Sequence, residues 1–302
     1  MRLAIAHDYL TQRGGAEKVV LALAKAFPDA PIYTTLFDAD GTYPEFSSMD
    51  IRPSFLNHVG PLRRNHRAAL LALPPAARSV KIDADVVIAS SSGWAHGFQT
   101  TGRKIVYCYS PARWLYQTDA YLGDGAGLAK RVTLALMASS LRRWDRRAAA
   151  QCDQYLAISR AVAGRINDVY GLDAAVLPAP VTLTALPDSE METVREIEPL
   201  VREEDSYYLC VSRLLAYKNV DKVLDAFAGS GRKLVVVGRG PERDALVAKN
   251  LPNVTFLQDL SDAQMSWLYR HCRAVVAASL EDYGLTPLEG AIYGKPCAVL
   301  RW

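Results

Sequence analysis

Short runs of consecutive apolar residues alternate along the chain with longer segments in which apolar positions recur every three or four residues. In the first half these runs are Leu3–Ala6, Ile32–Leu36, Val86–Ala89, Ile105–Tyr109 and Tyr155–Ile158. Runs of this length predict strands buried on both faces, as in a parallel sheet. Apolar residues from Ala16 to Phe27 follow helical spacing and predict a crossover helix between the first two strands. The pattern predicts an α/β fold built from βαβ units.

The same rhythm restarts near residue 207. Strands are expected at Tyr207–Val211, Leu234–Val237, Val254–Leu257, Ala274–Ala277 and Pro296–Leu300, with helices at Val220–Phe227, from Pro241, at Asp262–His271 and around Leu288–Tyr293. Residues Pro178–Ser206 contain four prolines and many acidic residues and show little periodicity, which indicates a linker. We therefore expect a first domain over 1–180, a linker over 181–206 and a second domain over 207–302.

Composition narrows the class of protein. The chain has 302 residues, of which 50% are hydrophobic, enough for two cores of domain size. The apolar opening is too short for a signal peptide, and no run approaches the roughly 18 apolar residues of a membrane span. Five scattered cysteines without a C-x-x-C pair are typical of free thiols in a reducing compartment. We expect a cytoplasmic protein.

Charge is unevenly distributed between the halves. Residues 1–180 carry 21 Lys and Arg against 15 Asp and Glu, a net +6, whereas residues 181–302 carry 14 against 17, a net −3. A basic half suits an anionic partner, although solvated surface charge gives the same count. One predicted helix carries Arg142, Arg143, Arg146 and Arg147. These arginines could rest on anionic lipid at the inner face of the membrane, or face water while Leu141 and Trp144 pack inward.

Two carboxylates eight residues apart give the strongest local signal. Glu281 follows a predicted strand, and Glu289 lies in the next helix. Thr286, Pro287 and Glu289 fit an N-cap, a first-turn proline and a capping-box glutamate, so we expect this helix to begin at Thr286. The unpaired amides of Leu285 and Thr286 would suit an anion. Alternatively, Glu289 only caps its helix and Glu281 is a solvated loop acid.

Two cations and a glycine pair are further candidates for contacts with phosphate. Arg213 and Lys218 follow the carboxyl end of a predicted strand, where parallel sheets bind ligands. Gly14 and Gly15 form the first strand-to-helix turn, where a backbone can approach a ligand closely. The glycine spacing does not fit a nicotinamide cofactor, and the sequence contains neither a zinc motif nor a serine-hydrolase motif. We expect no metal, no cofactor and no nucleic-acid partner.

Taken in order, the Gly14–Gly15 turn, Arg213 with Lys218 and the segment from Glu281 to Glu289 resemble glycosyltransferase family 4. The resemblance implies the GT-B architecture, in which two Rossmann-like domains face each other across a cleft. Family members usually continue with a further strand or two and a terminal helix, so we expect the second domain to be C-terminally incomplete.

Two other segments are most similar to the bacterial mannosyltransferase-like branch of the family, namely His7 to Leu10 and Tyr107 to Arg113. Family members often have Cys-His-Thr-Pro where this chain has Cys108-Tyr109-Ser110-Pro111. Tyr109 thus replaces a histidine associated with the catalytic centre. A phenol can hydrogen-bond to a substrate but cannot act as an imidazole base at neutral pH. His96 could compensate, although a single histidine is more often structural.

The resemblance also implies the roles of the site residues. The donor-binding residues would be Gly14, Gly15, Arg213, Lys218, Leu285, Thr286 and Glu289, with the two cations on the diphosphate and Glu289 on the ribose. Glu281 would lie near the sugar hydroxyls and, with Tyr109, belong to the catalytic centre. Retention would need no enzyme base, because the departing diphosphate can receive the acceptor proton. Cations and helix starts would replace a metal.

These implications lead to a specific functional expectation. We expect transfer of a hexose, mannose from GDP-mannose, to a saccharide or lipid-linked acceptor. The nearest alternative is a UDP-sugar donor. A weakly active or inactive homologue that binds a nucleotide sugar or a partner is another alternative, as are an epimerase and a phosphorylase. The sequence does not name the acceptor, because variable loops such as 38–55 and 123–128 would form its surface.

Overall fold

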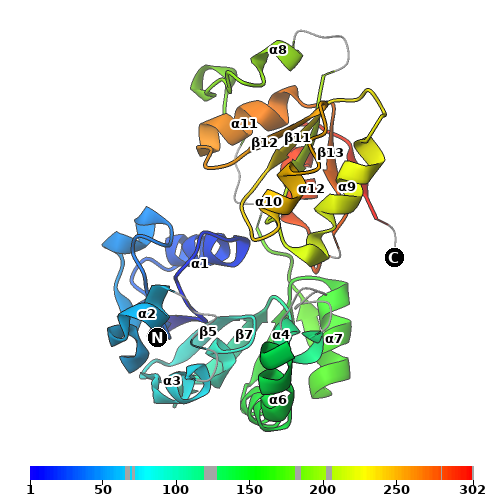
Figure 1. Ribbon diagram of the computed structural model, residues 1–302. Helices are drawn as coiled ribbons and strands as arrows, with labels where there is room; N and C mark the ends of the chain where they lie inside the picture. The colour runs from blue at the N-terminus through cyan, green and yellow to red at the C-terminus, as the bar shows by residue number, and fades with distance from the viewer. Residues whose placement is uncertain are drawn as a thin grey trace. The chain divides into compact units, whose positions relative to one another are not determined.

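The computed structural model describes residues 1–300 apart from 65–68, 70–71, 119–127, 181–184, 202–205 and 280. The chain divides into two compact units, Met1–Thr182 and Leu183–Trp302. Each unit contains a parallel sheet covered by helices (Figure 1). The predicted α/β fold class is therefore confirmed.

The first unit is organised around a sheet that has seven strands in the part of the chain described. Its order is β3-β2-β1-β5-β7-β8-β9, and every neighbouring pair is parallel. The strands are β1 Leu3–His7, β2 Ile32–Thr34, β3 Ile51–Pro53, β5 Val86–Ser91, β7 Arg103–Cys108, β8 Gln154–Ala157 and β9 Ala174–Val176. Strands β4 (Lys81–Ile82) and β6 (Gln99–Thr100) pair separately.

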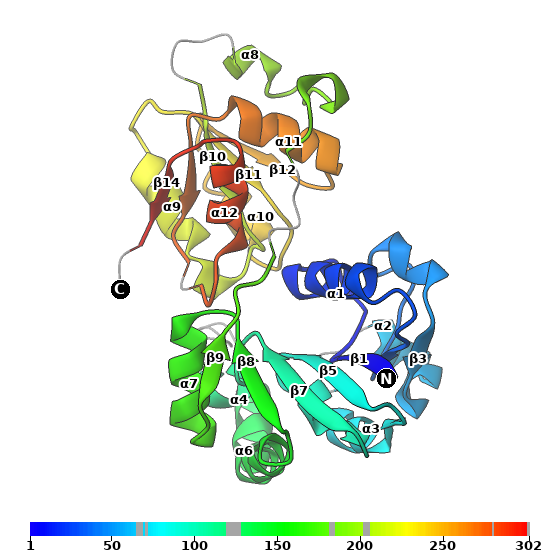
Figure 2. The ribbon, with the colours of Figure 1, turned by 180° about the vertical axis from the view of Figure 1, so that it is seen from behind.

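Helices cover both faces of this sheet. Helix α1 (Gly15–Ala26) lies on one face, and α3 (Leu73–Ser79) and α6 (Leu128–Ala149) lie on the other (Figure 2). Shorter helical elements and α7 complete the unit: η1 Pro44–Ser48, η2 Phe55–His58, α2 Gly60–Arg64, η3 Ala95–Gly97, α4 Arg113–Tyr116 and α7 Arg160–Tyr170. Val20 and Ala24 of α1 pack against Ile5 and Ile32 of the sheet, as their helical spacing predicts.

The second unit has a parallel sheet of five strands within the described residues, in the order β12-β11-β10-β13-β14. The strands are β10 Tyr208–Val211, β11 Leu234–Val237, β12 Val254–Leu257, β13 Ala274–Ala277 and β14 Cys297–Val299. The helices are η5 Ala216–Lys218, α9 Val220–Phe227, α10 Arg243–Val247, α11 Asp262–His271 and α12 Leu285–Ile292.

The core of the second unit has two sides, because alternate residues of each strand point to opposite faces. Leu209 and Val235 pack with α11, whereas Cys210 and Val236 pack with α9 and α10. Part of the segment expected as a linker also joins this core. It forms η4 (Asp188–Glu190) and α8 (Glu198–Val201), and buries Val194 and Ile197 beside α11.

Candidate functional site

The carboxyl ends of β10 and β13 mark the point in the second unit where the strand order reverses. From β10 the chain proceeds outward through β11 and β12, then returns to β13 on the other side of β10. Ligands of open parallel sheets bind at such a point. A pocket lies there, and its lining includes Ser212, Lys218, Ser279, Glu281, Gly284 and Thr286. The fold therefore brings together three of the residues predicted from the sequence, although Lys218 and Glu281 are 63 positions apart.

The loop after β10 is held in place by a glycine turn after β11. The Leu214 N–H donates to the Arg239 carbonyl oxygen at 2.8 Å, and Leu214 is fully buried. A Cβ on Gly238 or Gly240 would collide with the carbonyl oxygen of Ser212 or Leu214. The glycines of this turn are therefore required by the close approach of two loops.

Lys218 lies at the end of η5 and points across to the loop after β13. Its ammonium contacts Glu281 Oε1, to which the Ser279 hydroxyl also donates at 2.7 Å. Asn219, with a left-handed φ of 54°, starts α9 and donates from Nδ2 to the Ala278 carbonyl oxygen at 3.0 Å. Two contacts from neighbouring residues thus tie the β10 loop to the β13 loop.

Arg213 occupies the same loop but is exposed. Its Nη2 donates to the Tyr217 hydroxyl at 3.3 Å. The lining of the pocket in the described structure does not include Arg213. The two predicted cations therefore differ, since Lys218 is in the pocket and Arg213 lies on the loop outside its lining.

Helix α12 begins at Leu285, so the predicted start at Thr286 is wrong. Gly284, with φ of +82°, occupies the N-cap position, and no side chain caps the helix. The Thr286 hydroxyl donates instead to the Val211 carbonyl oxygen at 3.2 Å. Leu285 and Thr286 are therefore the first two helical residues, and Pro287 has no N–H to offer. The first-turn amides at this helix start are those of Leu285 and Thr286.

Glu289 does not act as a capping-box residue. Its Oε2 accepts a hydrogen bond of 2.7 Å from the hydroxyl of Tyr269 in α11. Burial raises the pKa of Tyr269, and the neighbouring Glu289 carboxylate raises it further, so the phenol stays neutral and donates. The capping prediction failed because the Glu289 carboxylate accepts a hydrogen bond from a tyrosine twenty residues earlier in the chain. The local sequence pattern carries no information about that contact.

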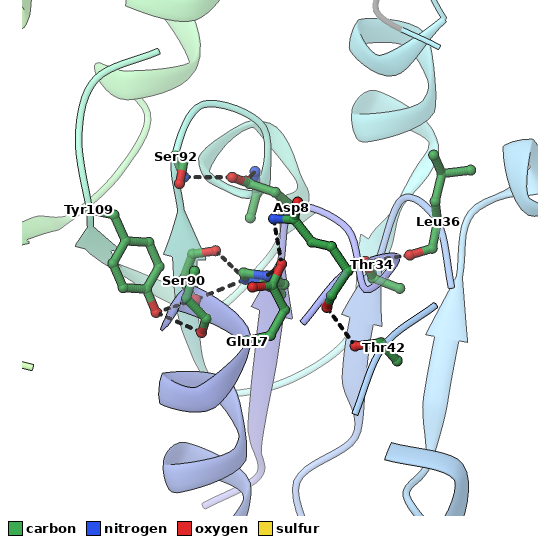
Figure 3. A network of polar contacts seen from close by, with 12 residues as sticks. Asp8, Glu17, Thr34, Leu36, Thr42, Ser90, Ser92 and Tyr109 are labelled. Atoms are coloured by element: carbon green, nitrogen blue, oxygen red, sulfur yellow. Dashed lines mark hydrogen bonds and ion pairs between the residues drawn. The ribbon is translucent and has the colours of Figure 1, made fainter. Parts of the chain in front are cut away.

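The first unit has a comparable reversal of strand order between β1 and β5. His7 ends β1, Ser90 lies in β5, Tyr109 follows β7, and Glu17 lies in the first turn of α1. Figure 3 shows Glu17, Ser90 and Tyr109 converging on one cluster. A Cβ on Gly14 would lie 2.5 Å from Glu17 Oε2, so the glycine at position 14 makes room for this carboxylate.

His7 and Glu17 form a fully buried ion pair, with His7 Nε2 at 3.9 Å from Glu17 Oε1. His7 Nδ1 lies 2.9 Å from Ser90 Oγ and 3.1 Å from the Ser90 carbonyl oxygen. Burial alone would lower the pKa of His7, but Glu17, Asp8 and the Ser90 carbonyl together raise it above the ordinary value of 6.5. Since acceptors face both ring nitrogens, the geometry favours the imidazolium.

Tyr109 is braced against the start of α1. Its hydroxyl lies 2.9 Å from Ser90 Oγ and donates to the Ala16 carbonyl oxygen at 3.3 Å. Burial raises the pKa of Tyr109 well above its ordinary value, which the Ser90 hydrogen bond offsets only in part. The phenol is therefore neutral, and its proton is already donated to the backbone of α1.

His96 belongs to a different buried cluster from Tyr109. Its Nε2 lies 3.1 Å from Asp145 Oδ1, and its ring packs beside Trp144. The imidazole connected to Tyr109 is His7, through Ser90. The position of His7 at the end of the first strand was the signal that could have identified it from the sequence.

Helix α6 turns Leu141 and Asp145 inward and leaves all four candidate arginines exposed. Arg142, Arg143, Arg146 and Arg147 line a shallow surface groove together with Ser139 and Ala150. Arg142 Nη2 also donates to the Leu115 carbonyl oxygen at 3.1 Å. Among the described residues, no helix is both long and apolar enough to cross a membrane, and no three His, Cys, Asp or Glu side chains are grouped as metal ligands.

Each of the two units matches a known protein family. The family described as "Glycosyltransferase Family 4" matches residues 13–184, and the family described as "Glycosyl transferases group 1" matches residues 193–301. The first match covers more than half of the chain. Both matches contain the predicted site residues of their respective units. His7, which was not predicted as a site residue, precedes the first match.

Individual proteins are similar over parts of the chain. D-rhamnosyltransferase WbpZ of Pseudomonas aeruginosa is 34% identical over 134 residues, which are 42% of this chain and 32% of that protein. O-antigen chain mannosyltransferase C of Escherichia coli is 35% identical over 99 residues, 30% of this chain and 27% of the relative. The similarity thus spans about a third of the length of these relatives.

Solved structures share the fold. The crystal structure of Anabaena Alr3699/HepE in complex with UDP and glucose superposes with a TM-score of 0.65 at 17% identity, covering 98% of this chain and 80% of that one. At this level of identity the likeness establishes the fold alone.

Proposed function

Because the chain belongs to glycosyltransferase family 4, with the two Rossmann-like units of the GT-B fold, we propose that it transfers a hexose from a nucleotide sugar to a saccharide or lipid-linked acceptor with retention. The single observation that carries this proposal is the convergence of Lys218, Glu281 and the start of α12 in one pocket, at the reversal point of the second sheet. A cation, a carboxylate and free helix amides suit a sugar diphosphate.

The proposal extends to the individual donor contacts. Lys218 and the amides of Leu285 and Thr286 bind the diphosphate, and Arg213 swings in from the same loop. Glu289 accepts from the ribose hydroxyls beside Tyr269. Glu281 accepts from hydroxyls of the sugar. For the first unit, we propose that the Gly14–Gly15 turn offers backbone amides to phosphate. The similar D-rhamnosyl- and mannosyltransferases favour a manno-configured sugar, and we propose GDP-mannose as donor. A UDP-sugar is the alternative donor, because the similar Anabaena structure contains UDP.

The proposed transfer needs no base from the protein. The bond between the anomeric carbon and the diphosphate breaks while the acceptor oxygen bonds to the same carbon on the same face. The acceptor proton passes to the departing phosphate oxygen. Lys218, Arg213 and the positive end of α12 stabilise the charge of the leaving group, which is the part a metal ion would otherwise play. We therefore propose metal-independent transfer without a further cofactor.

One observation favours a second candidate, a homologue that binds a nucleotide sugar but turns it over poorly. The Tyr109 hydroxyl is occupied between Ser90 and the Ala16 carbonyl, so it reaches no substrate without rearrangement. Turnover of a nucleotide sugar at rates typical of enzymes would exclude this candidate.

Calorimetric titration with GDP, UDP and ADP tests the donor site. We expect one nucleotide to bind, and both Arg213→Ala and Glu289→Ala to weaken it about tenfold or more, because each removes a charged hydrogen bond. Arg195→Ala and Glu196→Ala are matched controls, since both side chains are exposed and lie before α8. Equal affinity in all four variants would refute the proposed donor site.

A further inference from the structure

The contact between Lys218 and Glu281 joins two side chains to which the proposed function gives different parts of the donor. Lys218 would bind the diphosphate and Glu281 the sugar. In the structure the two side chains are bound to each other, because the Lys218 ammonium contacts Glu281 Oε1. A ligand that binds either side chain therefore competes with, or shares, their mutual contact.

Other groups around the pair hold this arrangement in place. The Lys218 side chain is 11% exposed and that of Glu281 is 31% exposed. The Lys218 ammonium lies 5.0 Å from the ring centre of Tyr217, and Ser279 donates to Glu281 at 2.7 Å. Asn219 ties the same two loops together beside them. Partly buried charges are screened less by salt than exposed ones, so the pair is a strong internal competitor for any ligand.

Binding of a bare nucleoside diphosphate disturbs this balance. The phosphate attracts Lys218, so that Glu281 keeps the Ser279 hydroxyl but no longer has the ammonium to itself. Phosphate and carboxylate then share one ammonium in a small pocket, where like charges repel. The ligand must offset that repulsion from its own binding free energy.

A nucleotide sugar relieves the same conflict. Its terminal phosphate is esterified and carries less charge than that of the free diphosphate. Its sugar hydroxyls can donate charge-assisted hydrogen bonds to the released Glu281 carboxylate. The carboxylate therefore exchanges an ammonium for hydroxyl donors instead of facing the phosphate.

We propose that Glu281, as the resident counter-ion of Lys218, makes the pocket discriminate between the sugar-bearing donor and the bare nucleoside diphosphate that remains after transfer. Glu281 is thus a specificity-determining residue that favours release of the product nucleotide. This inference rests on the proposed function, because it requires that a sugar diphosphate is the ligand of this pocket.

The test compares the Kd values of GDP and GDP-mannose, and of UDP and UDP-glucose, for the full chain by calorimetry without acceptor. Glu281→Gln removes the charge but keeps the size of the side chain. We expect it to bind the bare diphosphate about tenfold more tightly and the sugar nucleotide about tenfold more weakly. Lys218→Gln should weaken both ligands.

Three further variants separate this role from a structural one. Glu281→Asp keeps the charge, so the bare diphosphate should bind no more tightly than to the wild type. Asp225→Asn removes another carboxylate of the second unit, which pairs with Lys249 at 2.6 Å outside the pocket, and should leave both affinities unchanged. In the Lys218→Gln background, Glu281→Gln should lose most of its effect on the bare diphosphate if the two side chains act as a pair.

The outcomes distinguish the two levels of proposal. If none of the four ligands (GDP, GDP-mannose, UDP and UDP-glucose) binds the wild type, the proposed function is refuted and this inference with it. If the wild type binds but Glu281→Gln weakens the bare diphosphate, or changes the affinities for the bare diphosphate and the sugar nucleotide by the same factor, the donor site stands and the discrimination by Glu281 is overturned. If Glu281→Gln does not fold, Glu281→Asp decides, because tighter binding of the bare diphosphate by that variant contradicts the proposal.

Discussion

His7 and Glu17 of the first unit lie 3.9 Å apart with both side chains fully buried, and the contacts of His7 favour an ion pair there. Removing one member of a buried ion pair typically costs 3–5 kcal/mol, because the other charge stays uncompensated. Gln12, which donates to Glu17 at 3.0 Å, offsets part of this loss. We expect His7→Gln to lower the free energy of unfolding by about 3 kcal/mol at pH 6.

The same pair predicts a pH dependence of stability. The pKa of His7 in the folded protein lies above 6.5, so its stabilising contribution is fully present below pH 6.5 and is lost as the pH rises through the folded-state pKa. Urea unfolding of wild type and His7→Gln at pH 6 and pH 9 should show the difference shrinking at the higher pH. His271→Gln is the control on a partly exposed histidine. A difference that does not change with pH would contradict the imidazolium at His7.

Tyr109 also yields a prediction at this scale. If its hydroxyl only braces α1, Tyr109→Phe should cost about 1 kcal/mol of stability, the net value of a typical hydrogen bond. The pH profile of GDP release from GDP-mannose should then keep its shape. A lost or displaced limb of that profile would instead show that the phenol takes part in proton transfer.

Residue-level prediction from the sequence identified the pocket side chains but not their contacts. Lys218, Glu281 and Thr286 could be chosen because each follows the carboxyl end of a strand. The partners of Glu289 and Tyr109 are contributed by other elements, Tyr269 from α11 and Ser90 from β5, and a local pattern carries no information about such contacts. The helix cap was misassigned for the same reason.

At the scale of elements, α12 depends on a close approach to β13. A Cβ on Gly290 would lie 2.7 Å from Val275 Cγ2. Overpacking of this kind costs about 1–3 kcal/mol, which exceeds the roughly 1 kcal/mol that alanine gains over glycine in a helix. We expect Gly290→Ala to destabilise the chain and to weaken nucleotide binding, because it displaces the start of α12.

Two comparisons check this prediction by denaturant unfolding. Val275→Ala should relieve the clash, so that the double variant is more stable than the sum of the two single effects by about 1 kcal/mol. Gly164→Ala in α7 is the matched control, since an added Cβ there meets no atom within 4 Å. It should be neutral or stabilising by up to about 1 kcal/mol. Loss of stability in Gly164→Ala but not in Gly290→Ala would contradict the packing argument.

The exposed arginines of helix α6 lead us to predict electrostatic binding to anionic lipid. Its exposed face has arginines, whereas Leu141 points inward, so attraction to anionic lipid would come from charge and weaken with salt. We propose peripheral binding, measured by sedimentation with anionic vesicles. Arg143→Gln with Arg147→Gln should reduce binding severalfold, since each basic residue contributes about 1 kcal/mol near such a surface. Lys18→Gln with Lys25→Gln on α1 removes equal charge and should have less effect. Equal losses would assign the binding to net charge alone.

Strands were predictable from the sequence where a run of consecutive apolar residues marks them. The strands at Leu234–Val237, Val254–Leu257 and Ala274–Ala277 lie where the apolar runs predict them. The outermost strands β3 and β9 were missed, because each has only three residues, which is too short for a periodic pattern to show. Such edges form by pairing with a neighbour, which periodicity does not reveal.

At the scale of the whole molecule, the repeated βαβ rhythm was enough to predict two parallel sheets. The strand order was not predictable from that rhythm, and the order is what places β13 beside β10. Without it, residues 218 and 281 would remain two unrelated loop positions. The basic first half and acidic second half are consistent with an anionic surface as partner of the first unit, where the α6 arginines lie.

The central claim is that the donor binds at the carboxyl edge of β10 and β13. Hydrogen exchange of the full chain, measured with and without a saturating sugar nucleotide, tests it directly. We predict slower exchange in residues 212–219 and in the start of α12, including the amides of Leu285 and Thr286, and little change in α9 or β12. Binding without protection in either of those two segments would contradict the account.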